Sequence, residues 1–172
     1  MPIKILALLI FTGIQNPVKG QFVNIQLKVE PELSATIEQN LEFGNIVTNS
    51  GRTNISLGDV NMGIFKIRAF HTQNVYLSLQ YPEYLSHSDT RIDDRITLDL
   101  SMAYNNMGTN SYSDAMLLNG NNGYISVHER TAETYTNEIW KELYIYVFGI
   151  IDVGNITNGM YSGNIILSID FD

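Results

Sequence analysis

The feature of this sequence that most restricts its fold is an alternation of apolar and polar residues with a period of two. Successive side chains of a β-strand point to opposite faces of a sheet, so each alternating series predicts a strand with one core-facing side. The series recur along nearly the whole chain after its first twenty residues. They cover residues 23–29, 65–69, 75–81, 96–104, 143–147 and 165–171.

Short clusters rich in Asn and Gly separate these series. Both residue types tolerate a positive φ, so the clusters predict chain reversals, at residues 49–51, 58–59, 61–63, 119–123 and 158–159. The spacing of strands and turns predicts an all-β fold, an immunoglobulin-like antiparallel β-sandwich. Helical patterning is confined to residues 113–118 and 131–140.

The predicted strand over residues 140–150 is apolar on both faces. Leu143, Ile145 and Val147 occupy one face, whereas the opposite face carries aromatic side chains at Tyr144, Tyr146 and Phe148. This pattern predicts a central strand that is buried on each side.

The first twenty residues have the pattern of a secretory signal peptide. Lys4 precedes an apolar run over residues 5–14, and Pro17 interrupts the chain before Gly20. We expect an exported single domain over residues 21–172, with no transmembrane segment after signal removal, because no apolar run is long enough to cross a bilayer. The alternative is that residues 1–20 form a buried first strand or an interfacial helix.

The charge and cysteine content exclude several classes of function. The chain of 172 residues carries 10 basic and 18 acidic side chains; removal of residues 1–20 with Lys4 and Lys19 leaves a net charge of −10. Such a surface disfavours nucleic acid and other anionic partners. The absence of Cys excludes a disulfide framework, a Cys-ligated zinc site and a thiol nucleophile.

Residue patterns that would indicate catalysis or metal binding are weak. The three histidines, His71, His87 and His128, lack the short spacing of a zinc site. The run from Ser86 to Asp89 contains triad residue types, but sequence neighbours on one loop cannot form the relay geometry. We therefore predict no enzyme, no cofactor, and neither catalytic nor metal-ligating residues. A carboxylate pair for glycoside hydrolysis depends on a separation in space that the sequence does not supply.

An acidic loop is the one candidate for a bound cation. Asp89, Asp93 and Asp94 could share a calcium ion, since hard cations favour clustered carboxylates. The loop lacks the Asp-x-Asp-x-Asp-Gly pattern, and Arg91 and Arg95 lie between and after these carboxylates. The favoured interpretation is a solvated loop.

The two ends of the mature chain carry the most specific motifs. A Leu-x-Phe-Gly step occupies residues 41–44, and a Gly-x-Tyr-x-Gly step occupies residues 159–163. Gly159 is the fourteenth residue from the end and Phe171 is penultimate. These features resemble exported bacterial β-sandwich domains of the spore-coat-U and chaperone-usher fimbrial types, including a related group known only as a domain of unknown function. The chain differs from them in lacking a disulfide and in lacking a glycine within residues 23–29.

The resemblance implies a site and a mode of assembly. A sandwich that lacks one strand would expose a groove, bordered by the closing strand with Gly159, Ile165, Leu167, Ile169 and Phe171. Residues 21–30 would form a donor-strand extension that fills the groove of another copy. The donor side chains would be Val23, Ile25, Leu27 and Val29.

The function implied is that of a non-enzymatic subunit of a bacterial surface fibre or adhesive pilus, assembled by β-strand complementation. Its partners would be copies of itself or related subunits, a periplasmic chaperone and an outer-membrane usher. The protein would pass through the periplasm to the cell surface or an extracellular fibre.

Two alternatives stay open at this point. Both terminal segments can be ordinary strands of a complete monomeric sandwich, because alternation does not distinguish the two cases. The protein would then be a self-contained exported binding module for carbohydrate or a surface protein. Trp140 and the ten tyrosines could supply a stacking platform, although most of these aromatic residues lie at alternating strand positions typical of a core.

Overall fold

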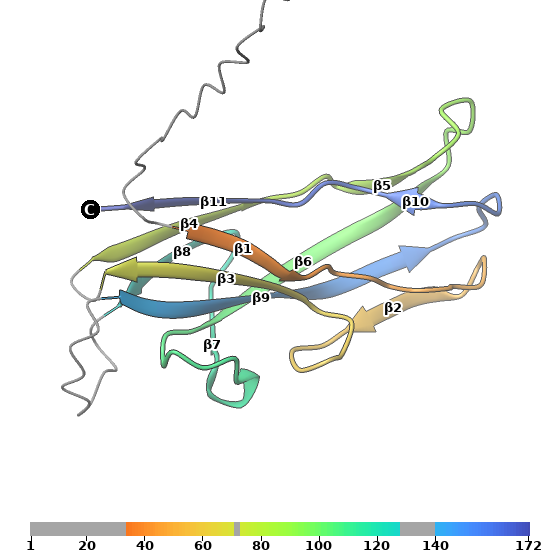
Figure 1. The fold of residues 1–172 in the computed structure, drawn as a ribbon. Coiled ribbons are helices and arrows are strands. Elements are labelled where there is room, and N and C mark those ends of the chain that lie inside the picture. The colour runs from red at the N-terminus through yellow and green to blue at the C-terminus, as the bar shows by residue number, and fades with distance from the viewer. Residues whose placement is uncertain (1–33, 71–72, 128–139) are drawn as a thin grey trace, which may run out of the picture.

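A computed structural model of the chain describes residues 34–70, 73–127 and 140–172. The predicted signal peptide (1–20), the donor-strand extension (21–30), His71 and His128 lie outside the described residues. Strands and one 3-10 helix make up the regular structure of the described part (Figure 1). In chain order the elements are β1 (Ser34–Gln39), β2 (Gly51–Ile55), β3 (Gly63–Phe70), β4 (Asn74–Gln80), β5 (Tyr84–His87), β6 (Arg95–Asn105), η1 (Tyr112–Asp114), β7 (Met116–Leu117), β8 (Asn122–Ser126), β9 (Trp140–Val153), β10 (Tyr161–Ser162) and β11 (Ile166–Phe171).

The strands form two antiparallel sheets. Sheet A has the order β1-β3-β9-β6-β5-β10, with β2 also pairing with β9 and β7 with β6. Sheet B has the order β11-β4-β8. Every strand pair is antiparallel, which confirms the prediction of an all-β, antiparallel fold.

The main core lies between the two sheets and is built from the alternating series predicted from the sequence. On sheet B it contains Val75, Leu77, Leu79, Ile125 and Val127. The sheet A side chains that face them are Ile67, Ala69, Ile96, Leu98, Leu100, Met102, Leu143, Ile145, Val147, Ile151 and Val153. Each of these side chains is at most 6% exposed, so the series at 65–69, 75–81, 96–104 and 143–147 identified the core-facing side of their strands correctly. The core residues Ile125, Val127, Ile151 and Val153 lie outside the predicted series.

Strand β9 is the central strand of sheet A. It pairs with β3 and then β2 on one edge, and with β6 on the other. Its outer face belongs to a second, smaller apolar cluster with Ile55, Met62, Ile64 and Ala103, in which Tyr146 is fully buried. The Tyr146 hydroxyl donates a hydrogen bond to Asn110 Oδ1 at 3.1 Å, and burial raises the pKa of this hydroxyl to about 12. The prediction of a central strand is confirmed, with its outer face fully buried at Tyr146 and partly buried at Tyr144 and Phe148.

One predicted turn and the Asn-rich segment before it differ from the sequence-based expectation. Asn122 and Gly123 are the first residues of β8, although the sequence places them in a turn. The Asn-rich segment before β8 folds over the outer face of sheet A, where the Tyr112 ring lies close to Gly58. Positive φ angles at Asn49, Gly51, Gly58 and Gly120 confirm the corresponding turns.

We predict that Gly149→Ala strongly destabilises the fold. A Cβ at Gly149 would collide with the carbonyl oxygen of Asp99 and lie 2.9 Å from Leu100 Cα, both backbone atoms of the neighbouring β6. Overpacking of this kind costs about 1–3 kcal/mol or more. Urea denaturation of residues 21–172 measures the loss. Gly154→Ala is the matched control, because a Cβ there meets no atom within 4 Å; equal stability of both variants would contradict the prediction.

Candidate functional site

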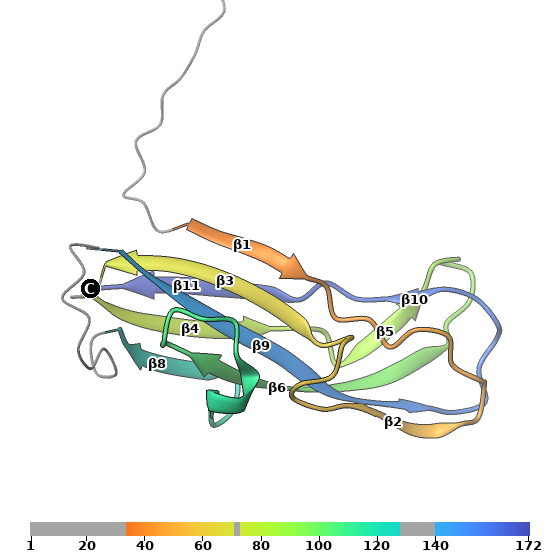
Figure 2. The ribbon, with the colours of Figure 1, turned by 60° about the horizontal axis from the view of Figure 1, so that its bottom comes forward.

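Two edge strands define the candidate site. Strand β1 ends sheet A and pairs only with β3, and β11 ends sheet B and pairs only with β4, among the residues described. Figures 1 and 2 both show β1 and β11 along the same long side of the molecule, running in opposite directions. Each strand therefore has an unpaired row of backbone groups on this side within the described part of the chain.

The apolar side of β11 is only partly covered. Leu167, Ile169 and Phe171 have the register partners Leu79, Leu77 and Val75 on β4, and directly opposed residues share one face of a sheet. The β4 side chains are at most 3% exposed, whereas all three β11 side chains are only half-buried. On the core-facing side of sheet B, the side chains are thus buried on β4 and partly exposed to solvent on β11.

Strand β1 shows the same loss of cover on sheet A. Ile37 is opposite Phe65, which packs against the main core, and Ala35 is opposite the fully buried Ile67. Despite this position, Ile37 is 65% exposed, and Ala35 is exposed too. The core-facing sides of the two edge strands are therefore open along the same side of the molecule.

The opposite edge of sheet B provides an internal comparison. Strand β8 is also an edge strand, since it pairs only with β4 in the described residues. Its core-facing Ile125 is nevertheless fully buried, as is Val127, which directly follows the strand. Position at an edge does not by itself expose the apolar side chains in this protein. On sheet B, the exposure of the apolar side chains is therefore confined to the β11 edge among the residues described.

The structure brings together four of the five residues predicted for the closing strand. Leu167, Ile169 and Phe171 lie on β11, and Ile165 directly precedes the strand and packs against the main core. Gly159 does not join them, because it lies in the loop between β9 and β10. The donor residues Val23, Ile25, Leu27 and Val29 lie outside the described residues. The contribution of Ala35 and Ile37 was missed, although their alternation after Pro31 signals a strand.

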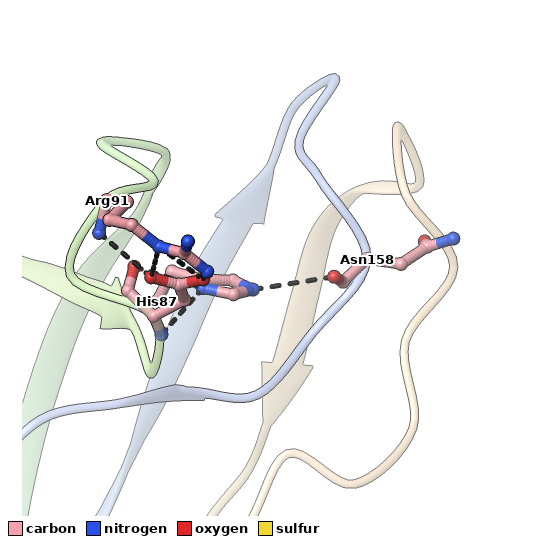
Figure 3. Close-up of polar contacts among 4 residues, drawn as sticks. His87, Arg91 and Asn158 are labelled. Carbon is pink, nitrogen blue, oxygen red and sulfur yellow. Dashed lines mark hydrogen bonds and ion pairs between the residues drawn. The ribbon is translucent and has the colours of Figure 1, made fainter.

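Gly159 has a packing role that the sequence did not indicate. A Cβ at this position would collide with the imidazole ring of His87. The ring is held on both sides: Nδ1 accepts a hydrogen bond from the backbone N–H of Asp89 at 2.9 Å, and Nε2 lies 3.4 Å from the carbonyl oxygen of Asn158 (Figure 3). It also makes an edge contact with Tyr161, with ring centroids 5.0 Å apart. His87 therefore ties the loop after β5 to the loop before β10.

The acidic loop forms separate pairs instead of one cluster. Arg91 Nη2 donates to Asp89 Oδ2 at 2.6 Å and Arg95 Nη2 donates to Asp93 Oδ1 at 3.0 Å, while Asp94 Oδ2 accepts the Thr157 N–H at 2.7 Å. The hydrogen bond from Arg91 lowers the pKa of Asp89, and that from Thr157 lowers the pKa of Asp94. No group of three metal-ligating side chains occurs within residues 34–70, 73–127 and 140–172.

The Ser86 to Asp89 run also lacks a relay contact. His87 Nδ1 receives its hydrogen bond from the Asp89 backbone, while the Asp89 carboxylate is engaged by Arg91. This arrangement stabilises a loop and offers no activated hydroxyl.

We predict that Gly159→Ala destabilises the fold by about 1–3 kcal/mol, because the added methyl group displaces an anchored ring. His87→Ala removes the obstacle, so Gly159→Ala should cost much less in that background. Denaturation of the two single variants and the double variant measures this coupling. Additive effects of the two substitutions would show that the contact is absent.

Comparisons of the chain with protein-family models, with curated proteins and with solved structures gave no match. Among the described residues, no helix has the length and apolar character needed to cross a bilayer. The open side formed by β1 and β11 is the candidate site that the geometry itself supports.

Proposed function

We propose that this protein is a non-enzymatic subunit of an exported bacterial surface fibre, in which a strand from a neighbouring copy completes the open side between β1 and β11. The observation that carries the proposal is the contrast between the two edges of sheet B: the apolar side of β11 is half-exposed, whereas the apolar side of β8 is buried. The two sheets then constitute an immunoglobulin-like sandwich that lacks one strand.

The open side has the chemistry that an added strand requires. Unpaired backbone groups provide hydrogen bonds to an extended segment, and alternate apolar side chains of that segment fill the uncovered core. Without such a segment, the exposed edge promotes aggregation. The exposed Ala35 and Ile37 on β1 and the half-buried apolar side chains of β11 supply the surface to be buried.

The donor proposed for this site is the segment with Val23, Ile25, Leu27 and Val29. Residues 23–29 in extended form span about 23 Å at about 3.3 Å per residue, close to the length of the six-residue β11. Burial of four aliphatic side chains contributes roughly 6–12 kcal/mol before ordering costs. Such an interaction can hold a polymer together.

The direction of the donor favours exchange between copies. Residues 21–30 are separated from β1 by a few residues, so insertion into the same molecule requires a hairpin with β1. A segment antiparallel to β1 would be parallel to β11, because β1 and β11 run in opposite directions (Figure 2). A donor from a neighbour is free to pair antiparallel with β11, which is the more stable arrangement per residue. Since donor and acceptor are different surfaces, the contact propagates as an open filament.

The remaining parts of the proposal come from the sequence. An exported subunit with an exposed edge requires protection in transit, and we propose a periplasmic chaperone and an outer-membrane usher as partners. The strongly acidic mature chain suits an extracellular location and disfavours nucleic acid.

We predict that residues 21–172 form polymers, whereas residues 31–172 are monomeric, less stable and able to bind a peptide of residues 21–30. Size-exclusion chromatography and thermal denaturation measure both effects. The matched control is the same peptide with Ile25→Asp and Leu27→Asp, which places two charges against the apolar side and should not bind. If residues 31–172 form a stable monomer that does not bind the peptide, the proposal is contradicted.

Engineered cysteines distinguish donation of the segment to another copy from its pairing within the same chain. The test is clean because the chain has no cysteine of its own. One preparation carries Ser168→Cys on the outward side of β11. The other carries Asn24→Cys, Gln26→Cys or Lys28→Cys, the residues that alternate with the donor side chains. Mixing followed by mild oxidation should yield a disulfide-linked heterodimer for one of the three. If the disulfide instead forms only within a monomer that carries both cysteines, and never between the mixed chains, the segment pairs with its own chain.

A further inference from the structure

A second surface with distinctive chemistry lies on the outer face of sheet B, away from the open side. Residues that alternate with the buried series of β4 point to this face, and the strand register places their neighbours on β8 and β11 beside them. One row across the three strands consists of Asp170, Tyr76 and Tyr124. The adjacent row consists of Ser168, Ser78 and Asn122.

The two tyrosines form a rigid, exposed pair. Tyr76 is 43% exposed and Tyr124 is 53% exposed, and their ring centroids lie 5.3 Å apart with the planes inclined at 57°. Two adjacent, partly exposed rings form a continuous apolar area on this face, and such areas can serve as binding surfaces. The rings supply flat apolar surface at a low cost in conformational entropy.

A hydrogen-bond network fixes the direction in which both rings lean. The Tyr76 hydroxyl donates to Asp172 Oδ2 at 3.2 Å, and the Tyr124 hydroxyl donates to Asn74 Oδ1 at 2.9 Å. Asn74 Nδ2 in turn donates to Asp172 Oδ1 at 3.0 Å. Partial burial and the nearby Asp172 carboxylate raise the pKa of Tyr76, so this hydroxyl stays protonated over the physiological range. The pair is therefore held in place before any ligand arrives.

The rings lean away from the adjacent row, and a hollow of about 530 Å³ is present there. Its lining includes Tyr76 and Asp170 at one end and the small or polar side chains Ser78, Ser168 and Asn122. Serine side chains are too short to fill the space beside a tyrosine. The surface thus combines an aromatic wall with a shallow floor of hydroxyl and amide groups.

This combination matches the chemistry of a sugar chain. Pyranose rings present C–H groups that pack on an aromatic face, and their hydroxyl groups exchange hydrogen bonds with serine, asparagine and aspartate side chains. Asp170 is the charged residue of these two rows, and the Asp172 carboxylate lies beside them as the acceptor from Tyr76 and Asn74, so an anionic ligand would be repelled. A neutral ligand meets no such penalty.

We infer that the outer face of sheet B binds a neutral oligosaccharide, with the Tyr76 and Tyr124 rings as the stacking surface and the Ser78 row as the polar floor. This site is separate from the open side between β1 and β11. It does not depend on whether the chain assembles into a fibre.

The test uses residues 21–172 and a panel of immobilised oligosaccharides, comprising neutral manno-, galacto-, gluco- and N-acetylglucosamine-containing chains together with sialylated and uronic-acid chains. We expect saturable binding to at least one neutral class and none to the acidic chains. Tyr76→Ala and Tyr124→Ala should each weaken that binding by about tenfold or more, equivalent to about 1.4 kcal/mol. Ser78→Tyr should abolish it by filling the hollow.

Tyr112→Ala is the matched control, because Tyr112 is 52% exposed and lies on the 3-10 helix η1, outside the three strands of this face. It should leave glycan binding unchanged. Circular dichroism and thermal denaturation confirm that each variant is folded before its binding is compared. Failure of every neutral chain to bind, preference for the acidic chains, or binding unaffected by Tyr76→Ala and Ser78→Tyr would each overturn the inference. Failure of strand exchange would leave it intact.

Discussion

The central position of β9 is the constraint on which the rest of the structure depends. This strand pairs along both edges and contributes buried side chains on both faces, so it connects the main core between the sheets to the smaller cluster on the outside of sheet A. At Gly149 the backbone of β6 leaves no room for a side chain, since a Cβ there would collide with Asp99 and Leu100. A long strand enclosed in this way leaves the edges of the sheets and the outer face of sheet B as the places where the fold can interact with other molecules.

The two sheets are unequal in extent, and this inequality produces the open side. Sheet A continues past β9 to β3 and β1, while sheet B ends at β11 in the described residues. The apolar residues on β11 and β1 consequently have a core-facing orientation without full cover. The buried Ile125 on β8 shows that the other edge is closed by its surroundings. An added strand on the open side would remove the difference between the two edges.

Two groups of hydrogen-bonding side chains lie in different parts of the molecule and differ in their exposure. At the end that carries the β5–β6 and β9–β10 loops, His87, Asp89 and Asp94 engage backbone groups or arginine and serve to fasten loops together. On the outer face of sheet B, Tyr76 and Tyr124 are anchored through their hydroxyls, yet their rings stay exposed. The side chains of the first group have hydrogen-bond partners within the chain. The second group retains surface that a ligand can use.

The alternation of apolar residues by itself determined that the fold is all-β, and it identified most of the main core. Series such as 75–81 and 96–104 identified their strands and the buried side of each, because successive side chains of a strand point to opposite faces. The aromatic residues over 144–148 identified the central strand. The closing series likewise placed Leu167, Ile169 and Phe171 on one side of β11. Only the tertiary structure decided that this side is open, that β1 borders it, and that Gly159 packs on His87 and lies apart from the strand. Exposure and close approach depend on which strands become neighbours, and neighbours in a sheet are brought together by contacts between residues far apart in the chain.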